Sequence, residues 1–182
     1  MDPQLSQHGL VHNHDKFPTA IYFIIPNEFC ERFCYFGIKN LLNQYLKKVF
    51  GYTDHEAKSQ VHLFSGFVYL FPLVGAAISD SFWGKYRTIL YFSFVYMLGN
   101  VLLSISSING AVGVYGSYPY YAFIIPVLLI AIGSGGIKPC VATHGGDQFL
   151  PSQALLMDKF FSFFYASISV GTLLSQYVTP LP

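Results

Sequence analysis

Long apolar stretches, separated by short polar ones, dominate this chain from residue 18 onward. A helix needs about 20 mainly apolar residues to cross a membrane. Five stretches of that kind are present, at about 18–46, 61–79, 88–108, 120–143 and 160–179. The links between them are 47–60, 80–87, 109–119 and 144–159. The pattern predicts an all-α membrane protein with about five transmembrane helices.

The first 17 residues have a different character, polar and rich in histidine, with His8, His12 and His14 among them. They lack the basic and apolar regions of a cleaved signal peptide. A solvated tail is favoured over a histidine metal tract. We therefore expect a polar cytoplasmic tail over 1–17 and a transmembrane helical bundle over 18–182. A small excess of Lys and Arg on the side that holds the amino terminus, with the uncharged link 109–119 opposite, agrees with that orientation.

The first apolar stretch carries charge where charge is costly. Helical spacing places Glu28, Glu31, Arg32, Tyr35 and Lys39 on one face. Each charge at the centre of a membrane helix costs about 2.5–3.5 kcal/mol. The stripe is expected to face a water-filled cavity, with Glu28 paired to Arg32 at i,i+4 and Glu31 able to exchange a proton. The alternative is an ordinary amphipathic helix of a soluble protein.

Composition narrows the choice of protein class. Of 182 residues, 53% are hydrophobic and 10% are charged, against about 25% charged in a soluble domain. The net charge of +1 and the lack of a basic run give no reason to expect nucleic acid. Three cysteines form no disulfide framework; Cys30 and Cys34 share a helix face, but small apolar side chains are favoured over a metal site there. No hydrolase motif occurs, so no enzyme is expected.

Two more sites combine charge with apolar surroundings. Residues 75–87 form a glycine-containing junction in which Asp80 is expected to pair with Lys85 or Arg87. Such a pair could hold two helices together in one conformation and release them in another. The alternative is that these charges only anchor helix ends at the membrane interface. Lys138 lies among apolar and small residues, where an ammonium needs a partner unless it snorkels to a helix end.

His62 and Tyr69 are seven residues apart and share a face of the second stretch. A histidine titrates near physiological pH and suits a proton relay. A structural histidine at a helix mouth is the alternative.

Several of these segments resemble sequence motifs of one protein family. Residues 28–37 resemble Glu-x-x-Glu-Arg-Phe-x-Tyr-Tyr-Gly, and residues 133–149 resemble Gly-[Thr/Ser]-Gly-Gly-Ile-Lys-Pro…Gly-Gly-Asp-Gln-Phe, which residues 160–165 continue. The junction 75–87 resembles the loop between the second and third helices of major facilitator transporters. From residue 18 to 182 the chain resembles the proton-coupled oligopeptide transporter family, in its animal-type branch.

The resemblance implies proton-coupled symport of di- and tripeptides across the plasma membrane or an endosomal or lysosomal membrane, with the proton as coupling ion and no cofactor. The implied roles are proton coupling for Glu28, Glu31, Arg32 and His62; substrate binding for Arg32, Tyr35, Lys39, Tyr69 and Lys138; and a cytoplasmic gate of Asp80, Lys85 and Arg87.

The chain departs from the family pattern at two positions and in length. Phe36 replaces a tyrosine of the first motif, and Ser169 replaces an asparagine of the fifth helix that is thought to hold the substrate. Family members have about twelve helices in two halves. The expected partner is the missing carboxy-terminal half or a full-length carrier; the alternative is a non-transporting product that associates with such a carrier.

Overall fold

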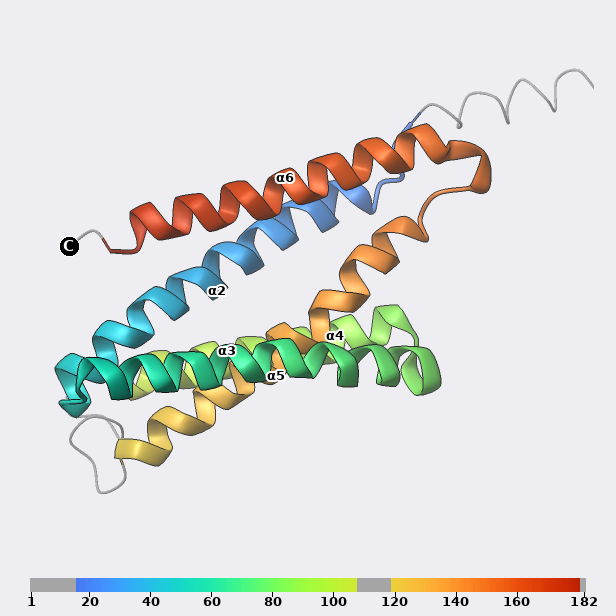
Figure 1. Ribbon diagram of the computed structural model, residues 1–182. Helices are drawn as coiled ribbons and strands as arrows, with labels where there is room; N and C mark the ends of the chain where they lie inside the picture. Colours follow the sequence, from blue (N-terminus) through green and yellow to red (C-terminus); the bar gives the residue numbers. More distant parts are fainter. Residues whose placement is uncertain (1–15, 108–118, 181–182) are drawn as a thin grey trace, which may run out of the picture.

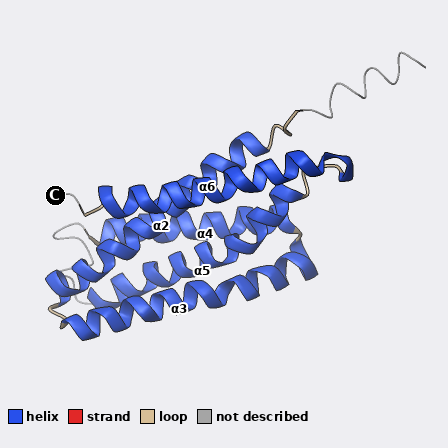
Figure 2. Cartoon of the chain, turned by 45° about the horizontal axis from the view of Figure 1, so that its top comes forward, coloured by secondary structure: helices blue, strands red, loops and turns tan. Residues whose placement is uncertain are grey.

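The computed structural model describes residues 16–107 and 119–180, and the described chain is a bundle of five long helices, as predicted (Figures 1 and 2). Most of the expected tail 1–17 and of the link 109–119 lies outside the described residues. The elements are α2 (Ile21–Phe50), α3 (Asp54–Ile78), the π-helical turn η1 (Ser79–Trp83), α4 (Lys85–Ser106), α5 (Pro119–Gly146), the 3-10 turn η2 (Pro151–Gln153) and α6 (Ala154–Val178).

The helices extend beyond the apolar stretches. The expected polar link 47–60 is wrong, because most of its residues belong to α2 or α3. α2 continues to Phe50, where Gly51 ends it in the left-handed conformation at φ 66°, a common helix stop. α3 begins at once with a capping box. Thr53 Oγ1 accepts the Glu56 N–H at 3.4 Å, and Glu56 Oε2 accepts the Thr53 N–H at 2.9 Å. These local signals decide the boundaries because capping depends on single residues rather than on apolar content.

α5 is the centre of one group of helices, with α3 and α4 both packed against it (Figure 1). Its glycines allow this approach. A Cβ atom at Gly136 would come within 2.5 Å of the Phe92 ring of α4, and one at Gly75 of α3 within 2.6 Å of the Gly136 carbonyl oxygen. At the glycine-rich segment that precedes Lys138, α3 therefore meets α5 backbone to backbone, and α4 packs a ring against the same segment.

α2 and α6 form the second group, running in the same direction side by side (Figures 1 and 2). Ser175 Oγ of α6 donates to the Phe33 carbonyl oxygen of α2 at 2.7 Å. A Cβ atom at Gly171 would lie 2.9 Å from the Phe29 carbonyl oxygen, so the helices touch backbone to backbone there too. Small residues and interhelical hydrogen bonds are how helices associate in lipid.

Three helical segments are long and apolar enough to cross a membrane, namely 54–83, 85–106 and 121–146. α5 is the most enclosed, with 61% of its most apolar window buried against the other helices. α2 and α6 do not meet the same limits of length and composition. α2 is the helix that carries the charged stripe.

Candidate functional site

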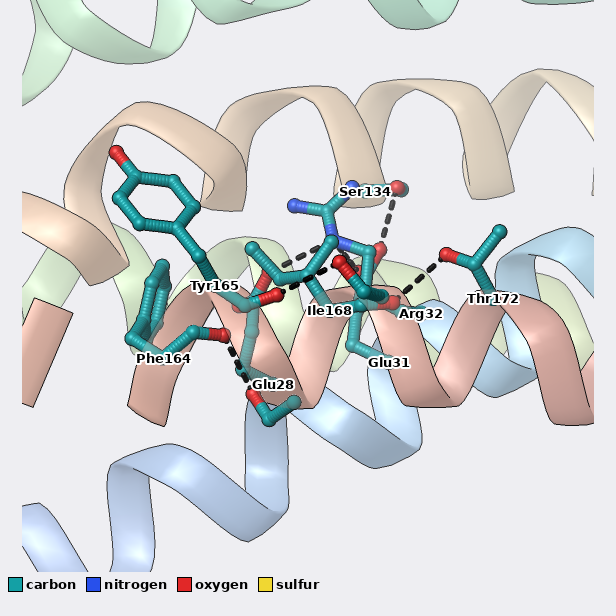
Figure 3. Close-up of polar contacts among 10 residues, drawn as sticks. Glu28, Glu31, Arg32, Ser134, Phe164, Tyr165, Ile168 and Thr172 are labelled. Atoms are coloured by element: carbon teal, nitrogen blue, oxygen red, sulfur yellow. Dashed lines mark hydrogen bonds and ion pairs between the residues drawn. The ribbon is translucent and has the colours of Figure 1, made fainter. Parts of the chain in front are cut away.

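The predicted ion pair of α2 is present and buried. Arg32 Nε lies 2.7 Å from Glu28 Oε1 and 3.3 Å from Glu31 Oε2, so one guanidinium serves two carboxylates (Figure 3). Glu28 is 2% exposed and Glu31 8% exposed, and the Arg32 side chain is 13% exposed. Buried charges persist only when they are paired. The geometry therefore gives a compact triad on a single helix, set between α5 and α6.

Glu31 also bonds to a second helix. Ser134 Oγ of α5 donates to Glu31 Oε1 at 2.6 Å (Figure 3). Glu31 Oε2 has no hydrogen-bond partner in the described part of the chain. One oxygen of this carboxylate is thus anchored by a hydroxyl, while the other lies beside Arg32. The sequence analysis did not include Ser134, although it is four residues before Lys138 and therefore shares its helix face.

Lys138 of α5 lies over two aromatic rings. Its Nζ is 4.5 Å from the centre of the Tyr35 ring and 5.3 Å from the centre of the Tyr69 ring, so it joins α2, α3 and α5. Cation–π contacts stabilise an ammonium without neutralising it. No carboxylate of the described residues lies within salt-bridge distance of Lys138. The family resemblance implied that these three residues and Lys39 line one site, and the structure brings Tyr35, Tyr69 and Lys138 into contact.

Lys39 and His62 form no ion pair in the described part of the chain, although Lys39 lies close enough for its charge to act on Lys138. Lys39 lines a separate cleft of about 420 Å³ nearer the end of α2. His62 is exposed on α3, and within residues 16–107 and 119–180 it forms no hydrogen bond or ion pair with the triad. A role for either residue in the central site needs contacts beyond those seen here.

At the opposite end of the bundle, the expected ion pair of Asp80 with Lys85 or Arg87 is wrong. Lys85 Nζ, at the first turn of α4, pairs with Asp147 Oδ2 just after α5, rather than with Asp80. Asp80 and Arg87 are exposed and have no ion pair among the described residues. The π-helical turn Ser79–Trp83 separates Asp80 from α4, which begins with Lys85 beside the end of α5. Asp147 belongs to the motif segment 133–149.

The two departures from the family motifs have simple structural positions. The Phe36 ring meets the Tyr35 ring edge-on, with centroids 5.1 Å apart, and packs against the core. Ser169 Oγ donates to the Tyr165 carbonyl oxygen of its own helix at 3.0 Å. Cys30 and Cys34 are exposed. No group of three or more His, Cys, Asp or Glu residues in the described ranges could hold a metal ion.

Comparison with known proteins identifies the family. A sequence profile named PTR2, of the POT family, matches residues 86–181. The chain belongs to the POT family. It is 48% identical to peptide transporter family 1 of Drosophila melanogaster and 44% identical to human solute carrier family 15 member 2, over 91% of this chain in each case but only 22% of each relative. The crystal structure of the POT family transporter PepTSo superposes with a TM-score of 0.80 at 37% identity, over 91% of this chain and 32% of that one.

These matches explain the architecture. The POT relatives are integral membrane transporters rather than enzymes, and the chain has their fold. It spans less than a quarter of the curated relatives named above. The five helices are therefore an incomplete amino-terminal bundle of a major-facilitator POT protein, as the motifs predicted. The triad, Ser134 and Lys138 all lie within it.

Proposed function

We propose that this chain is the amino-terminal part of a carrier that couples inward proton flow to the uptake of di- and tripeptides. The observation that carries the proposal is the buried triad of Glu28, Glu31 and Arg32, in which Glu31 Oε2 has no hydrogen-bond donor among the described residues. Peptide transport is what the name of the Drosophila melanogaster relative states for that protein. A titratable carboxylate between helices is a common element of proton relays.

The charges of the site supply a mechanism. With both carboxylates ionised, Glu28 and Glu31 balance Arg32 and Lys138. A proton on Glu31 leaves one net positive charge, in a setting where charge is poorly screened. A peptide carboxylate then restores neutrality. Proton and peptide therefore favour each other's binding, which is the coupling that a symporter requires.

The remaining roles follow from position. Arg32, once Glu31 is protonated, is freer to meet the peptide carboxylate, and Lys138 beside Tyr35 and Tyr69 offers a second cation. Partners for the peptide amine would come from the rest of the carrier. His62 is proposed as a further proton acceptor. Lys39 is proposed as an outlying substrate contact.

The cytoplasmic gate would centre on the Lys85–Asp147 pair, with Asp80 and Arg87 as alternative partners when it opens. The proton is the coupling ion, and no cofactor is proposed. The plasma membrane is the proposed location, with an endosomal or lysosomal membrane as the alternative.

The test is uptake of a labelled dipeptide by cells that express the complete gene product containing this chain. Uptake should rise when the external medium is acidified and should be inhibited by unlabelled di- and tripeptides but not by a single amino acid. Uptake that ignores external pH, or that an amino acid inhibits equally well, would overturn the proposal. Surface labelling of the carrier gives the control for expression.

A further inference from the structure

A small cavity lies between α2, α4 and α5, beside the triad but on another face of α2. Its volume is about 230 Å³. We call it the α2–α4 pocket, which is lined by Asn27, Cys30, Glu31, Cys34, Ser93, Tyr96 and Ile137. Tyr35, Tyr69 and Lys138 are not among its lining residues. The pocket is therefore distinct from the cluster at which a peptide is proposed to bind.

Glu31 lies where two faces of α2 meet. It is three residues after Glu28, which belongs to the triad, and four residues after Asn27, which lines the α2–α4 pocket, and both spacings place side chains next to each other on a helix. The lining includes Glu31 but neither Glu28 nor Arg32. Glu31 thus connects the triad with the pocket.

Two buried polar atoms of the residues that line the pocket lack a partner. Glu31 Oε2 and the Tyr96 hydroxyl are both enclosed, and neither forms a hydrogen bond with another described residue. Tyr96 lies close enough to Glu31 for the carboxylate charge to act on its hydroxyl group. Buried water satisfies such groups where a cavity offers room and about two to four polar partners. The pocket offers that room, and Asn27 and Ser93 supply further partners.

The charges near Glu31 are arranged unevenly around it. Its ionisable neighbours are Glu28, Arg32, Cys34 and Tyr35 of α2, Tyr96 of α4 and Lys138 of α5. Neither of the two cations in this set lines the α2–α4 pocket. A positively charged species that approaches Glu31 through the pocket therefore meets a carboxylate and no fixed cation.

We propose that the α2–α4 pocket holds the water that brings the proton to Glu31, while the peptide meets Arg32 and Lys138 on the other face. A proton passes from hydronium to the Glu31 carboxylate: one O–H bond of hydronium breaks, one forms on the carboxylate, and water remains. Tyr96 is a positioning residue, since its hydroxyl orders the water by a hydrogen bond. This inference rests on the proposed transport function and gives its two substrates separate routes.

Tyr96→Phe removes the hydroxyl group and keeps the ring. In proteoliposomes that contain the complete gene product, it should slow gradient-driven dipeptide uptake about 2–10-fold, the effect of one hydrogen bond. Exchange of labelled for unlabelled dipeptide at one acid pH needs no net proton movement and should change much less. Tyr91→Phe is the matched control, because Tyr91 lies on the same helix, is exposed and does not line the pocket. Equal slowing of uptake and exchange by Tyr96→Phe would show a structural role and overturn the proposal, as would uptake at the rate of Tyr91→Phe.

The volume of the pocket gives a second test. Cys34 is exposed, so the bundle should tolerate substitutions there. Cys34→Leu fills the pocket with apolar atoms, whereas Cys34→Ser leaves room for water. Gradient-driven uptake should therefore be slower in the first variant than in the second. Equal rates in the two variants would overturn the role of water in the pocket.

A third measurement does not depend on transport. After rapid acidification of the purified carrier, the infrared band of the protonated Glu31 carboxyl group, identified by its loss in Glu31→Gln, reports the arrival of the proton. The band should rise more slowly in Tyr96→Phe, and a saturating dipeptide should not slow it in the unaltered protein. A dipeptide that slows it would show one shared route and overturn the proposal. If the unaltered carrier takes up no peptide, the transport function is wrong, whereas the infrared comparison with Tyr96→Phe still decides the water route.

Discussion

Among single residues, Glu31 is the most important to the proposed coupling, which depends on what its carboxylate oxygens contact. Ser134 donates to one carboxylate oxygen at 2.6 Å, and Arg32 lies 3.3 Å from the other. The sequence made Glu31 and Arg32 predictable because helical spacing follows from position alone. It did not disclose Ser134, whose contact with Glu31 crosses 103 residues of sequence and depends on how α5 packs.

Ser134→Ala should move the uptake curve toward higher pH. The substitution removes a hydrogen bond to the ionised carboxylate, so Glu31 takes up a proton more readily. The loss of one such bond corresponds to about 1.5–3 kcal/mol. Uptake measured across a pH series checks this. Ser162→Ala is the control, because Ser162 Oγ bonds only its own helix, at the Asp158 carbonyl oxygen; an equal shift in both variants would contradict the role of Ser134.

Substitutions at Tyr69 test the contact between its ring and the Lys138 ammonium group. Because the ring face and not the hydroxyl attracts the ammonium, Tyr69→Phe should bind peptide nearly as well as the unaltered chain. Tyr69→Leu should weaken binding about 2–5-fold, as expected for a cation–π contact of 0.5–1 kcal/mol. Competition of unlabelled dipeptide against labelled dipeptide gives the comparison. Equal loss in both variants would point to the hydroxyl instead.

At the scale of helices, sequence and structure agree on number and differ on boundaries. Apolar stretches predict where a membrane core is, whereas helices begin and end at capping residues such as Thr53 and Gly51. The π-helical turn at Ser79–Trp83 had no sequence signal. It explains why Lys85 pairs with Asp147 across helices instead of with its near neighbour Asp80, a choice that local spacing does not determine.

The Lys85–Asp147 pair links α4 to α5 and should respond to charge exchange. Asp147→Lys alone and Lys85→Asp alone should each reduce uptake, because each places like charges together. The double exchange should restore a large part of it. The pair is partly exposed, with 33% and 54% of the two side chains accessible. The change in thermal stability should therefore stay within about 1 kcal/mol. Failure of the double exchange to restore uptake would argue against a gate at this pair.

A substitution at Gly136 tests the close contact of α5 with α3 and α4. Gly136→Ala places a methyl group against the Phe92 ring and should destabilise the bundle by about 1–3 kcal/mol, as overpacking does. Gly66 is the matched control, a helical glycine with no atom within 4 Å of an added Cβ. Gly66→Ala should be neutral or stabilising by about 0.5–1 kcal/mol. Thermal unfolding in detergent measures both, and equal stability of the two variants would contradict the packing.

Across the whole molecule, the features best predicted from the sequence are those whose residues lie close together in the chain. The fold and the ion pair of α2 were predictable, since each depends on residues within one motif or on helical spacing. The contact of Lys138 with two rings does not follow from spacing, because Tyr35, Tyr69 and Lys138 lie on three different helices. Only the family resemblance indicated that these residues belong to one site.

The central claim is that Glu31 carries the proton that drives peptide uptake. The most direct measurement uses proteoliposomes containing the complete gene product, with labelled dipeptide and an imposed inward proton gradient. Glu31→Gln should abolish gradient-driven accumulation but retain exchange of labelled for unlabelled peptide, because the amide mimics the protonated carboxyl group. Asp158→Asn, at an exposed carboxylate of α6, should keep both. Gradient-driven accumulation by Glu31→Gln at the level of the unaltered protein would contradict the account.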